Sequence, residues 1–271
     1  MKKHLLLLLL CGASFATIAQ VKKDTLTKKT PKVLTEDEVN LKGKTTEDTS
    51  LSYAEEYKRD AVKFMVGVRG AAMLNRMNIN EIQAVRVQSN GLPLLENNML
   101  VRDNFVDNTA TKTGFSAGFF VRLTRGSFFF QPEFLFASKG GKFDILKSDG
   151  KLAARVTGSY KTIDIPLLIG LRFRKGRIFG GPVTSFPLKM NDGLKSALAT
   201  YTHQSLDKGF FNRPVLLLQG GLGFEFDKFF IDVRYEKSLS SYSNVTIGPS
   251  SNPSQFRFTS NSFTFSIGLI Q

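Results

Sequence analysis

The sequence predicts an all-β protein, an eight-stranded antiparallel transmembrane β-barrel preceded by a signal peptide and a flexible periplasmic tether. Three observations predict this architecture. The chain starts with a leucine-rich leader, and apolar and polar residues then alternate with a period of two. The connections between the alternating segments are short and long in alternation. This combination is typical of proteins that cross an outer membrane as closed sheets.

Residues 1–19 have the features of a secretory signal peptide. Lys2 and Lys3 give a basic start, the run Leu5–Leu10 is wholly apolar, and small residues precede a cleavage point near Ala19. The run is too short to span a membrane as a helix. Cys11 follows Leu10 directly, which is too early for the usual lipoprotein pattern, so we expect an unlipidated chain.

Residues 20–62 form a segment of a different composition, which we interpret as a flexible periplasmic tether. The segment carries nine Lys/Arg and nine Asp/Glu, and it contains none of the 25 phenylalanines. So little apolar surface cannot offset the entropy lost on ordering. Of the phenylalanines, 24 lie in residues 63–271, which we predict to be one barrel domain.

The strands of this domain are predicted from alternation alone. In the second, for instance, Phe115, Ala117 and Phe119 alternate with Ser116 and Gly118. Eight such runs occur, at about residues 63–72, 115–124, 128–136, 162–173, 177–186, 214–226, 229–236 and 262–269. A period of two indicates strands that present one face to each environment.

The connections between these strands alternate in length. They are tight after the second, fourth and sixth strands, and long at about residues 75–112, 140–159, 187–213 and 239–257. Outer-membrane barrels have short periplasmic turns and longer external loops. With eight strands, both ends of the barrel would then be periplasmic, and the protein would lie in the cell outer membrane.

The composition of the two strand faces predicts which face contacts lipid and which lines the lumen. One face is bulky and apolar, as lipid requires, and the other carries glycine, small hydroxyl residues and charges. A small lumen can hold charges only in paired networks. The predicted lumen network is Arg69, Arg122, Glu133, Asp164, Arg172, Glu225, Asp232, Arg234 and Glu236. A soluble lipocalin-like barrel is the alternative that these faces disfavour.

The net charge of +14 is concentrated in the barrel domain. After an export signal, anionic lipid headgroups are more plausible partners than nucleic acid, which we do not expect to bind. The second long loop is basic, and it is a candidate site for lipopolysaccharide phosphates, with an ordinary hydrated loop as the alternative. Its basic residues are Lys139, Lys142, Lys147, Lys151, Arg155 and Lys161.

The residue types of the mature chain give little indication of a catalytic or metal site. His203 is the one histidine of the mature chain, so a Cys/His zinc site is excluded, and we expect no cofactor. His203 shares a long loop with Asp192, Ser205 and Asp207, which leaves a loop-borne acyl-transfer or hydrolytic enzyme as an alternative. The glycine-rich segments Gly67–Gly70 and Gly220–Gly223 do not precede a helix, and they indicate crowding inside a barrel.

A series of short motifs resembles a known family. The motifs are Phe130–Phe134 with Lys139-Gly140, Ile165–Leu168, Gly180–Pro182, Gly220–Glu225, and Asp232–Tyr235 with Leu239. In order and spacing they resemble the PorT-type outer-membrane β-barrel family of the Bacteroidetes, over roughly residues 63–271. The resemblance implies a barrel fold. Since the founding member of the family is associated with type IX secretion, it also suggests a role in protein export.

The expected function is therefore a non-enzymatic one. We expect a structural or accessory component of an outer-membrane assembly, in contact with outer-membrane lipids and with other outer-membrane or periplasmic proteins as candidate partners. A narrow pore or small-ligand-binding barrel remains a further alternative, although eight strands enclose a lumen just wide enough for side chains.

Overall fold

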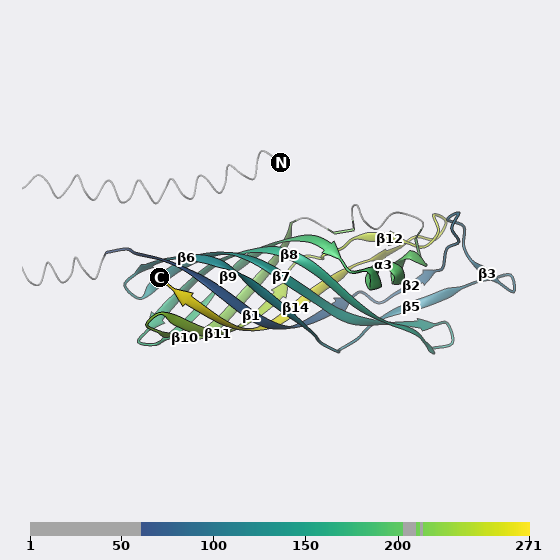
Figure 1. Ribbon diagram of the computed structural model, residues 1–271. Helices are drawn as coiled ribbons and strands as arrows, with labels where there is room; N and C mark the ends of the chain where they lie inside the picture. The colour runs from purple at the N-terminus through teal and green to yellow at the C-terminus, as the bar shows by residue number, and fades with distance from the viewer. Residues whose placement is uncertain (1–60, 203–209, 212–213) are drawn as a thin grey trace, which may run out of the picture. The chain divides into compact units, whose positions relative to one another are not determined.

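The computed structural model describes residues 61–202, 210–211 and 214–271. Eight long strands in this part of the chain form a closed antiparallel ring (Figure 1). They are β1 (Lys63–Ile79), β6 (Lys112–Arg125), β7 (Phe128–Lys147), β8 (Leu152–Phe173), β9 (Gly176–Met190), β10 (Val215–Phe226), β11 (Phe229–Ser238) and β14 (Phe258–Ile270). The predicted signal peptide and nearly all of the predicted tether lie outside the described residues.

The ring closes between the first strand and the last. Each long strand pairs with the next long strand along the chain, and β1 pairs with β14 from Gly67–Ile270 to Ile79–Phe258. The backbone amides of Val66 and Gln271 each donate to the carbonyl oxygen of the other. The eight strands predicted from alternation are therefore confirmed, and the ring has no open edge.

The connections confirm part of the predicted rhythm. Two residues join β6 to β7, β8 to β9, and β10 to β11. Each tight turn contains a residue with positive φ, namely Gly126, Arg174 or Asp227, as two-residue hairpins require. The tight turns lie at the same end of the barrel as the start of β1 and the end of β14.

The second long loop is not a loop, and this corrects the sequence-based prediction for residues 140–159. Strands β7 and β8 remain paired up to Leu146 and Leu152, so only residues 148–151 form the turn. Alternation predicted the strands to end earlier because the apolar face stops near Phe136. The strands in fact continue beyond that point, but there the outward face is polar and the inward face is apolar.

Beyond the ring, short elements build what we call the extension, at the end opposite the tight turns. Strand β5 (Arg102–Asp107) pairs with the far end of β7, and β2 (Ile82–Val85) pairs with β5. Two small hairpins, β3–β4 and β12–β13, and the helix α3 complete it. The first hairpin consists of β3 (Leu95–Glu96) and β4 (Met99–Leu100), and the second of β12 (Val245–Ile247) and β13 (Ser254–Phe256). The helix α3 spans Asp192–Ala199.

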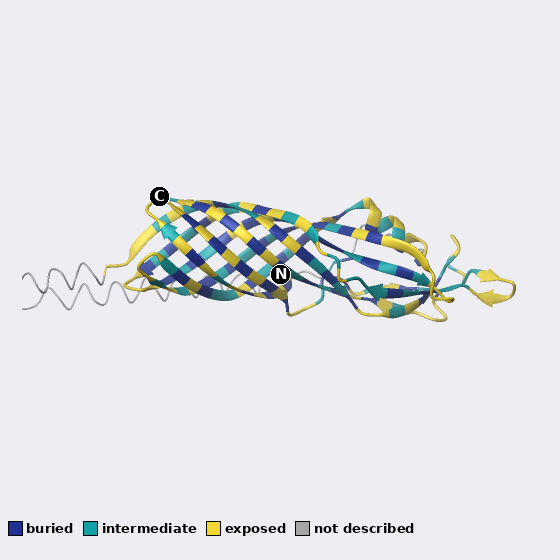
Figure 2. Ribbon diagram, turned by 90° about the horizontal axis from the view of Figure 1, so that it is seen from below, coloured by how far each residue is buried: buried dark blue, intermediate teal, exposed yellow. Residues whose placement is uncertain are grey.

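The outer surface of the ring carries an apolar belt. On β1, Phe64, Val66, Val68 and Leu74 are all exposed on the outside of the barrel. The alternation of exposed and buried residues gives the wall its chequered pattern in Figure 2. Ten residue steps from Phe64 to Leu74, at about 3.4 Å each and a tilt of about 40°, give a belt about 25 Å tall, the height typical of membrane barrels.

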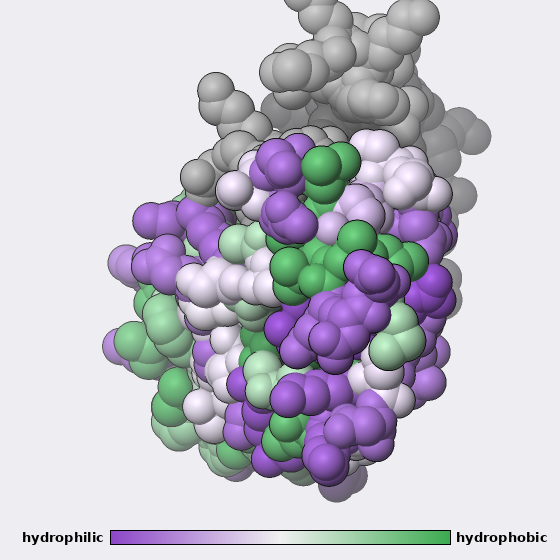
Figure 3. All heavy atoms as spheres, turned by 90° about the vertical axis from the view of Figure 1, so that its right-hand side faces the viewer, coloured by the Kyte–Doolittle hydropathy of each residue, from purple (hydrophilic) through white to green (hydrophobic). Residues whose placement is uncertain are grey.

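The two faces exchange character where the belt ends. On β7, outward-facing Phe134 and Phe136 give way to Lys142 and Asp144, while inward-facing Gln131 and Glu133 give way to apolar residues such as Phe143. The extension therefore has an apolar interior and a polar exterior, like a soluble protein. Seen end-on, it presents many hydrophilic residues with apolar ones between them (Figure 3).

Candidate functional site

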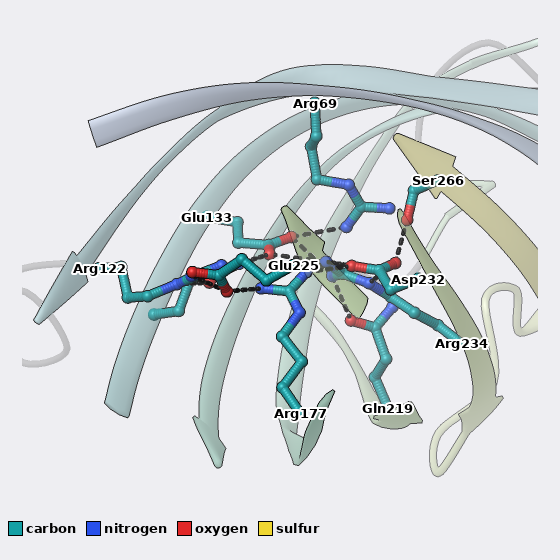
Figure 4. Close-up of polar contacts among 10 residues, drawn as sticks. Arg69, Arg122, Glu133, Arg177, Gln219, Glu225, Asp232, Arg234 and Ser266 are labelled. Carbon is teal, nitrogen blue, oxygen red and sulfur yellow. Dashed lines mark hydrogen bonds and ion pairs between the residues drawn. The ribbon is translucent and has the colours of Figure 1, made fainter. Parts of the chain in front are cut away.

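The lumen inside the belt is filled by charged side chains, with Arg234 at their centre (Figure 4). Its guanidinium group donates to both carboxylate oxygens of Glu133, at 2.9 and 3.1 Å, and to both of Asp232, at 2.8 and 3.0 Å. Arg69 donates to Glu133 at 2.7 Å. All four side chains are buried. Two-pronged contacts of this kind fix the geometry of both partners.

Neutral polar side chains add further hydrogen bonds to the charged groups of this centre. The Gln131 amide donates to Glu133 at 2.5 Å, and the Ser266 hydroxyl donates to Asp232. Arg234 also donates to the amide oxygen of Gln219, at 3.2 Å. Buried carboxylates are stable only when such partners replace the water that they lose.

Toward the tight turns, three arginines gather around two carboxylates. Glu225 pairs with Arg122 at 2.7 Å and with Arg172 at 2.9 Å, and Arg177 pairs with Asp232 at 2.6 Å. Arg122 and Arg177 are fully buried, whereas the Arg172 side chain is 30% exposed at the mouth of the lumen. The network therefore extends from the middle of the belt to the tight-turn end.

Aromatic rings fill the space between these arginines. The guanidinium group of Arg122 lies 5.5 Å from the centre of the Phe120 ring and 5.7 Å from that of Phe230, within cation–π distance. A Cβ atom at Gly67 would overlap the Phe120 ring, and one at Gly268 would overlap the Phe230 ring. These glycines thus provide the space for inward rings, in agreement with the predicted crowding.

Toward the extension, a lysine takes over the role of the arginines. The Lys139 ammonium group lies between Asp164, at 2.9 Å, and Glu236, which it also contacts. Ser185 donates to Asp164 at 2.5 Å. All four side chains are buried, and beyond them begins the apolar interior of the extension.

The prediction of Lys139 as an anion-binding loop residue is therefore wrong. Its position on β7 turns its side chain into the lumen, because inward positions on this strand are odd-numbered through the belt. The other predicted loop residues also lie on strands, apart from Lys151 in the turn. Lys142 and Lys147 are on β7, and Arg155 and Lys161 are on β8.

The structure brings the predicted lumen residues together. All nine take part in ion pairs: Arg69, Arg122, Glu133, Asp164, Arg172, Glu225, Asp232, Arg234 and Glu236. Sequence reasoning missed Arg177 and Lys139. The signal for Arg177 is its position two residues before Phe179, another inward side chain on β9.

A second polar cluster lies in the extension, outside the belt. The buried carboxylate of Asp103 accepts hydrogen bonds from Arg86 at 2.5 Å and from the Tyr201 hydroxyl at 2.6 Å. Burial, and then the contact with Asp103, raise the pKa of Tyr201 above its ordinary value. The hydrogen bond to Asp103 raises the pKa of Arg86. This cluster connects the residue after β2, strand β5 and the segment after α3.

The predicted catalytic alternative falls in a gap of the structure. His203, Ser205 and Asp207 lie outside the described residues, so the arrangement of this set remains a prediction. Within residues 61–202, 210–211 and 214–271, no group of three His, Cys, Asp or Glu side chains is arranged to hold a metal ion. In the same part of the chain, no helix has the length and hydropathy needed to cross a membrane.

Comparison with known families agrees with the closed ring and its apolar belt. A family model described as "Outer membrane protein beta-barrel domain" matches residues 64–244, which is most of the ring. The chain belongs to this family. As an outer membrane β-barrel protein it is located in the cell outer membrane, and the belt is its lipid-facing surface.

Solved structures of two other proteins are similar to this family member at low identity. The translocator domain of autotransporter NalP from Neisseria meningitidis is 12% identical over 87% of this chain and 99% of that chain, with a TM-score of 0.23. OpdQ from Pseudomonas aeruginosa is 8% identical over 77% of this chain and 98% of that chain, with a TM-score of 0.16. A search of curated proteins found no match.

Proposed function

We propose that this outer membrane barrel is non-enzymatic and non-conducting, and that it serves as a structural or accessory component of an outer-membrane assembly. The observation that carries the proposal is the filled lumen. Six basic side chains and five carboxylates occupy it: Arg69, Arg122, Lys139, Arg172, Arg177 and Arg234, with Glu133, Asp164, Glu225, Asp232 and Glu236. The near balance of charge lets these groups pair across an eight-stranded lumen, which side chains can fill.

The proposed orientation follows from the tight turns. Short turns are typical of the periplasmic side of outer-membrane barrels. We therefore place the tight turns, the start of β1 and the C-terminus in the periplasm, and the extension at the cell surface. In this orientation the tether, nearly all of which lies outside the described residues, would also be periplasmic.

The hairpin β3–β4 is the part of the extension best suited to contact another protein. Leu92, Leu95 and Met99 on and beside this hairpin have 60%, 54% and 69% of their surface exposed, although they lie outside the belt. Asn97 and Asn98, both with positive φ, form the turn. Exposed apolar side chains clustered on a small projecting hairpin are typical of interaction sites. The resemblance to the PorT-type family further suggests export machinery of the type IX class as the assembly.

Planar-bilayer recording tests the non-conducting part of the proposal. We expect the purified barrel to insert without stepwise conductance, because the paired charges and the rings occupy the lumen. The matched control replaces Arg69, Glu133, Asp232 and Arg234 by alanine together. This variant should give transient openings if it folds, which heat-dependent migration on a gel would establish. Stepwise conductance by the unmodified protein would contradict the proposal.

Purification from native outer membranes under mild detergent tests the assembly role. We expect partner proteins to be retained by the unmodified chain and lost from L95S/M99S. The control is L152S, because Leu152 is also exposed, at 52%, and also lies outside the belt, but on β8. Large export subunits among the partners would support the type IX proposal. Recovery of a monomer without partners would contradict an assembly role.

A further inference from the structure

Four lysines lie on neighbouring strands of the outer wall, beyond the apolar belt. Lys112 starts β6, Lys142 is on β7, Lys161 is on β8 and Lys189 is on β9, and these strands are neighbours in the ring. We refer to these four residues as the lysine patch. Each strand carries an apolar outward residue on the membrane side of its lysine: Phe115, Phe136, Ile163 and Phe186, with Ser138 and Gly140 between Phe136 and Lys142.

A β-bulge turns one of these lysines outward. Strand β9 has one extra residue, Leu188, between the pairs Thr162–Pro187 and Lys161–Lys189. Regular alternation would turn Lys189 toward the lumen, but the extra residue brings it directly opposite Lys161, with both exposed. Like charges directly opposite on paired strands are unfavourable, and bulges often re-aim side chains at functional positions.

A third lysine reaches the same place across a glycine. The Lys112 side chain lies over Gly140 of β7, where a Cβ atom would come within 2.9 Å of Lys112 Cδ. Its ammonium group donates to the hydroxyl of Ser159 on β8, two residues from Lys161. Partial burial, and then the repulsion from Lys142, lower the pKa of Lys112. The patch therefore holds crowded positive charges.

The neighbouring carboxylates do not neutralise the patch. Asp144 pairs with Arg155 at 2.9 Å and also accepts a hydrogen bond from Asn108. Asp107 pairs with Arg76 at 2.8 Å. Among the described residues, no ion pair joins any of the four lysines to a carboxylate. The positive charge is thus available to an external anion at the level of the lipid headgroups.

We propose that the lysine patch binds the phosphate groups of an outer-leaflet glycolipid, with the acyl chains of that lipid lying along the belt below. Such a lipid has phosphates for the lysine patch and acyl chains for the apolar belt. Lysines at a membrane boundary reach headgroup phosphates while the methylene part of each side chain stays against apolar neighbours. The proposal rests on the proposed orientation, in which the extension is at the cell surface and the patch faces the outer leaflet.

Native mass spectrometry of the delipidated protein in detergent, titrated with bisphosphorylated lipid A, tests the proposal. We expect K161Q/K189Q to weaken binding about 30-fold, because it removes two phosphate contacts. The control K147Q/K151Q removes the same charge from the far tip of the β7–β8 hairpin and should bind like the unmodified protein. Since K161Q/K189Q relieves a repulsive pair, its barrel should remain folded, as heat-dependent gel migration would verify.

Three further probes separate the sources of the phosphate. Dephosphorylated lipid A tests the charge contacts, phosphatidylglycerol tests an inner-leaflet lipid, and inorganic phosphate tests the anion alone. We expect each to bind at least tenfold more weakly than bisphosphorylated lipid A. Equal binding of any one of them, or equal binding by K161Q/K189Q and the unmodified protein, would overturn the proposal. None of these results depends on the conductance or co-purification experiments, so the two proposals can fail separately.

Discussion

Arg234 is the residue on which the other lumen charges converge. It holds Glu133 and Asp232 through two-pronged contacts, and these carboxylates in turn hold Arg69 and Arg177. Alternation along β11 is enough to predict that Arg234 faces the lumen. It does not predict which carboxylates Arg234 meets, because these come from strands far apart in the sequence.

Substitution of Arg234 should be among the most damaging single changes. We expect R234M to lower the free energy of unfolding by about 3–5 kcal/mol, because Glu133 and Asp232 would each lose their main buried partner. Urea unfolding in detergent micelles would measure the effect. The control is K237M on the same strand, where the side chain is exposed and the expected change is under about 0.5 kcal/mol. Similar values for both variants would show that the network does not stabilise the barrel.

At the scale of the element, the exchange of faces along single strands is the main feature. On β6, outward residues from Phe115 to Leu123 are apolar, whereas Thr113 lies just beyond the belt. The same change occurs between Leu74 and Arg76 on β1 and between Tyr235 and Lys237 on β11. These positions mark one boundary of the membrane.

From this boundary we predict that the loss of stability caused by one introduced charge depends strongly on its depth in the membrane. F119R, near the middle of the belt, should destabilise the barrel in lipid vesicles by about 2–4 kcal/mol, because the arginine must enter hydrocarbon. T113R, on the same strand beyond the boundary, should cost about 0–1 kcal/mol. Urea-induced unfolding from vesicles would compare the two. An equal cost at both positions would mean that the belt is not the lipid-facing surface.

For the whole molecule, the even number of strands is decisive. It brings the start of β1 and the end of β14 to the tight-turn end, and it leaves the extension at the other end. In the proposed function, charged and aromatic side chains occupy the lumen, so surfaces rather than the interior are available to partners. The hairpin β3–β4 and the lysine patch are such surfaces.

Cysteine labelling in whole cells tests the orientation of the molecule. The native chain has one cysteine, Cys11, which lies in the predicted signal peptide. We expect S251C, in the exposed turn between β12 and β13, to react with a membrane-impermeant maleimide on intact cells. K228C, in the tight turn between β10 and β11, should react only after permeabilisation. The reverse pattern would contradict the proposed orientation.

The sequence by itself determined the number of strands, the positions of the tight turns and the inward direction of nine charged side chains. These properties are local, because a period of two needs only the neighbouring residues to be recognised. The exchange of apolar and polar faces beyond Phe136 is also a local pattern. It resembles the end of a strand, because the outward face stops being apolar there.

Only the tertiary structure decided which groups meet. Lys139 belongs to the lumen because β7 continues past the belt, and it lies between Asp164 of β8 and Glu236 of β11. Lys189 faces outward because β9 contains a bulge. Both results depend on strand register and on the closure of the ring, which are set by pairing between segments distant in the chain. No local pattern contains that information.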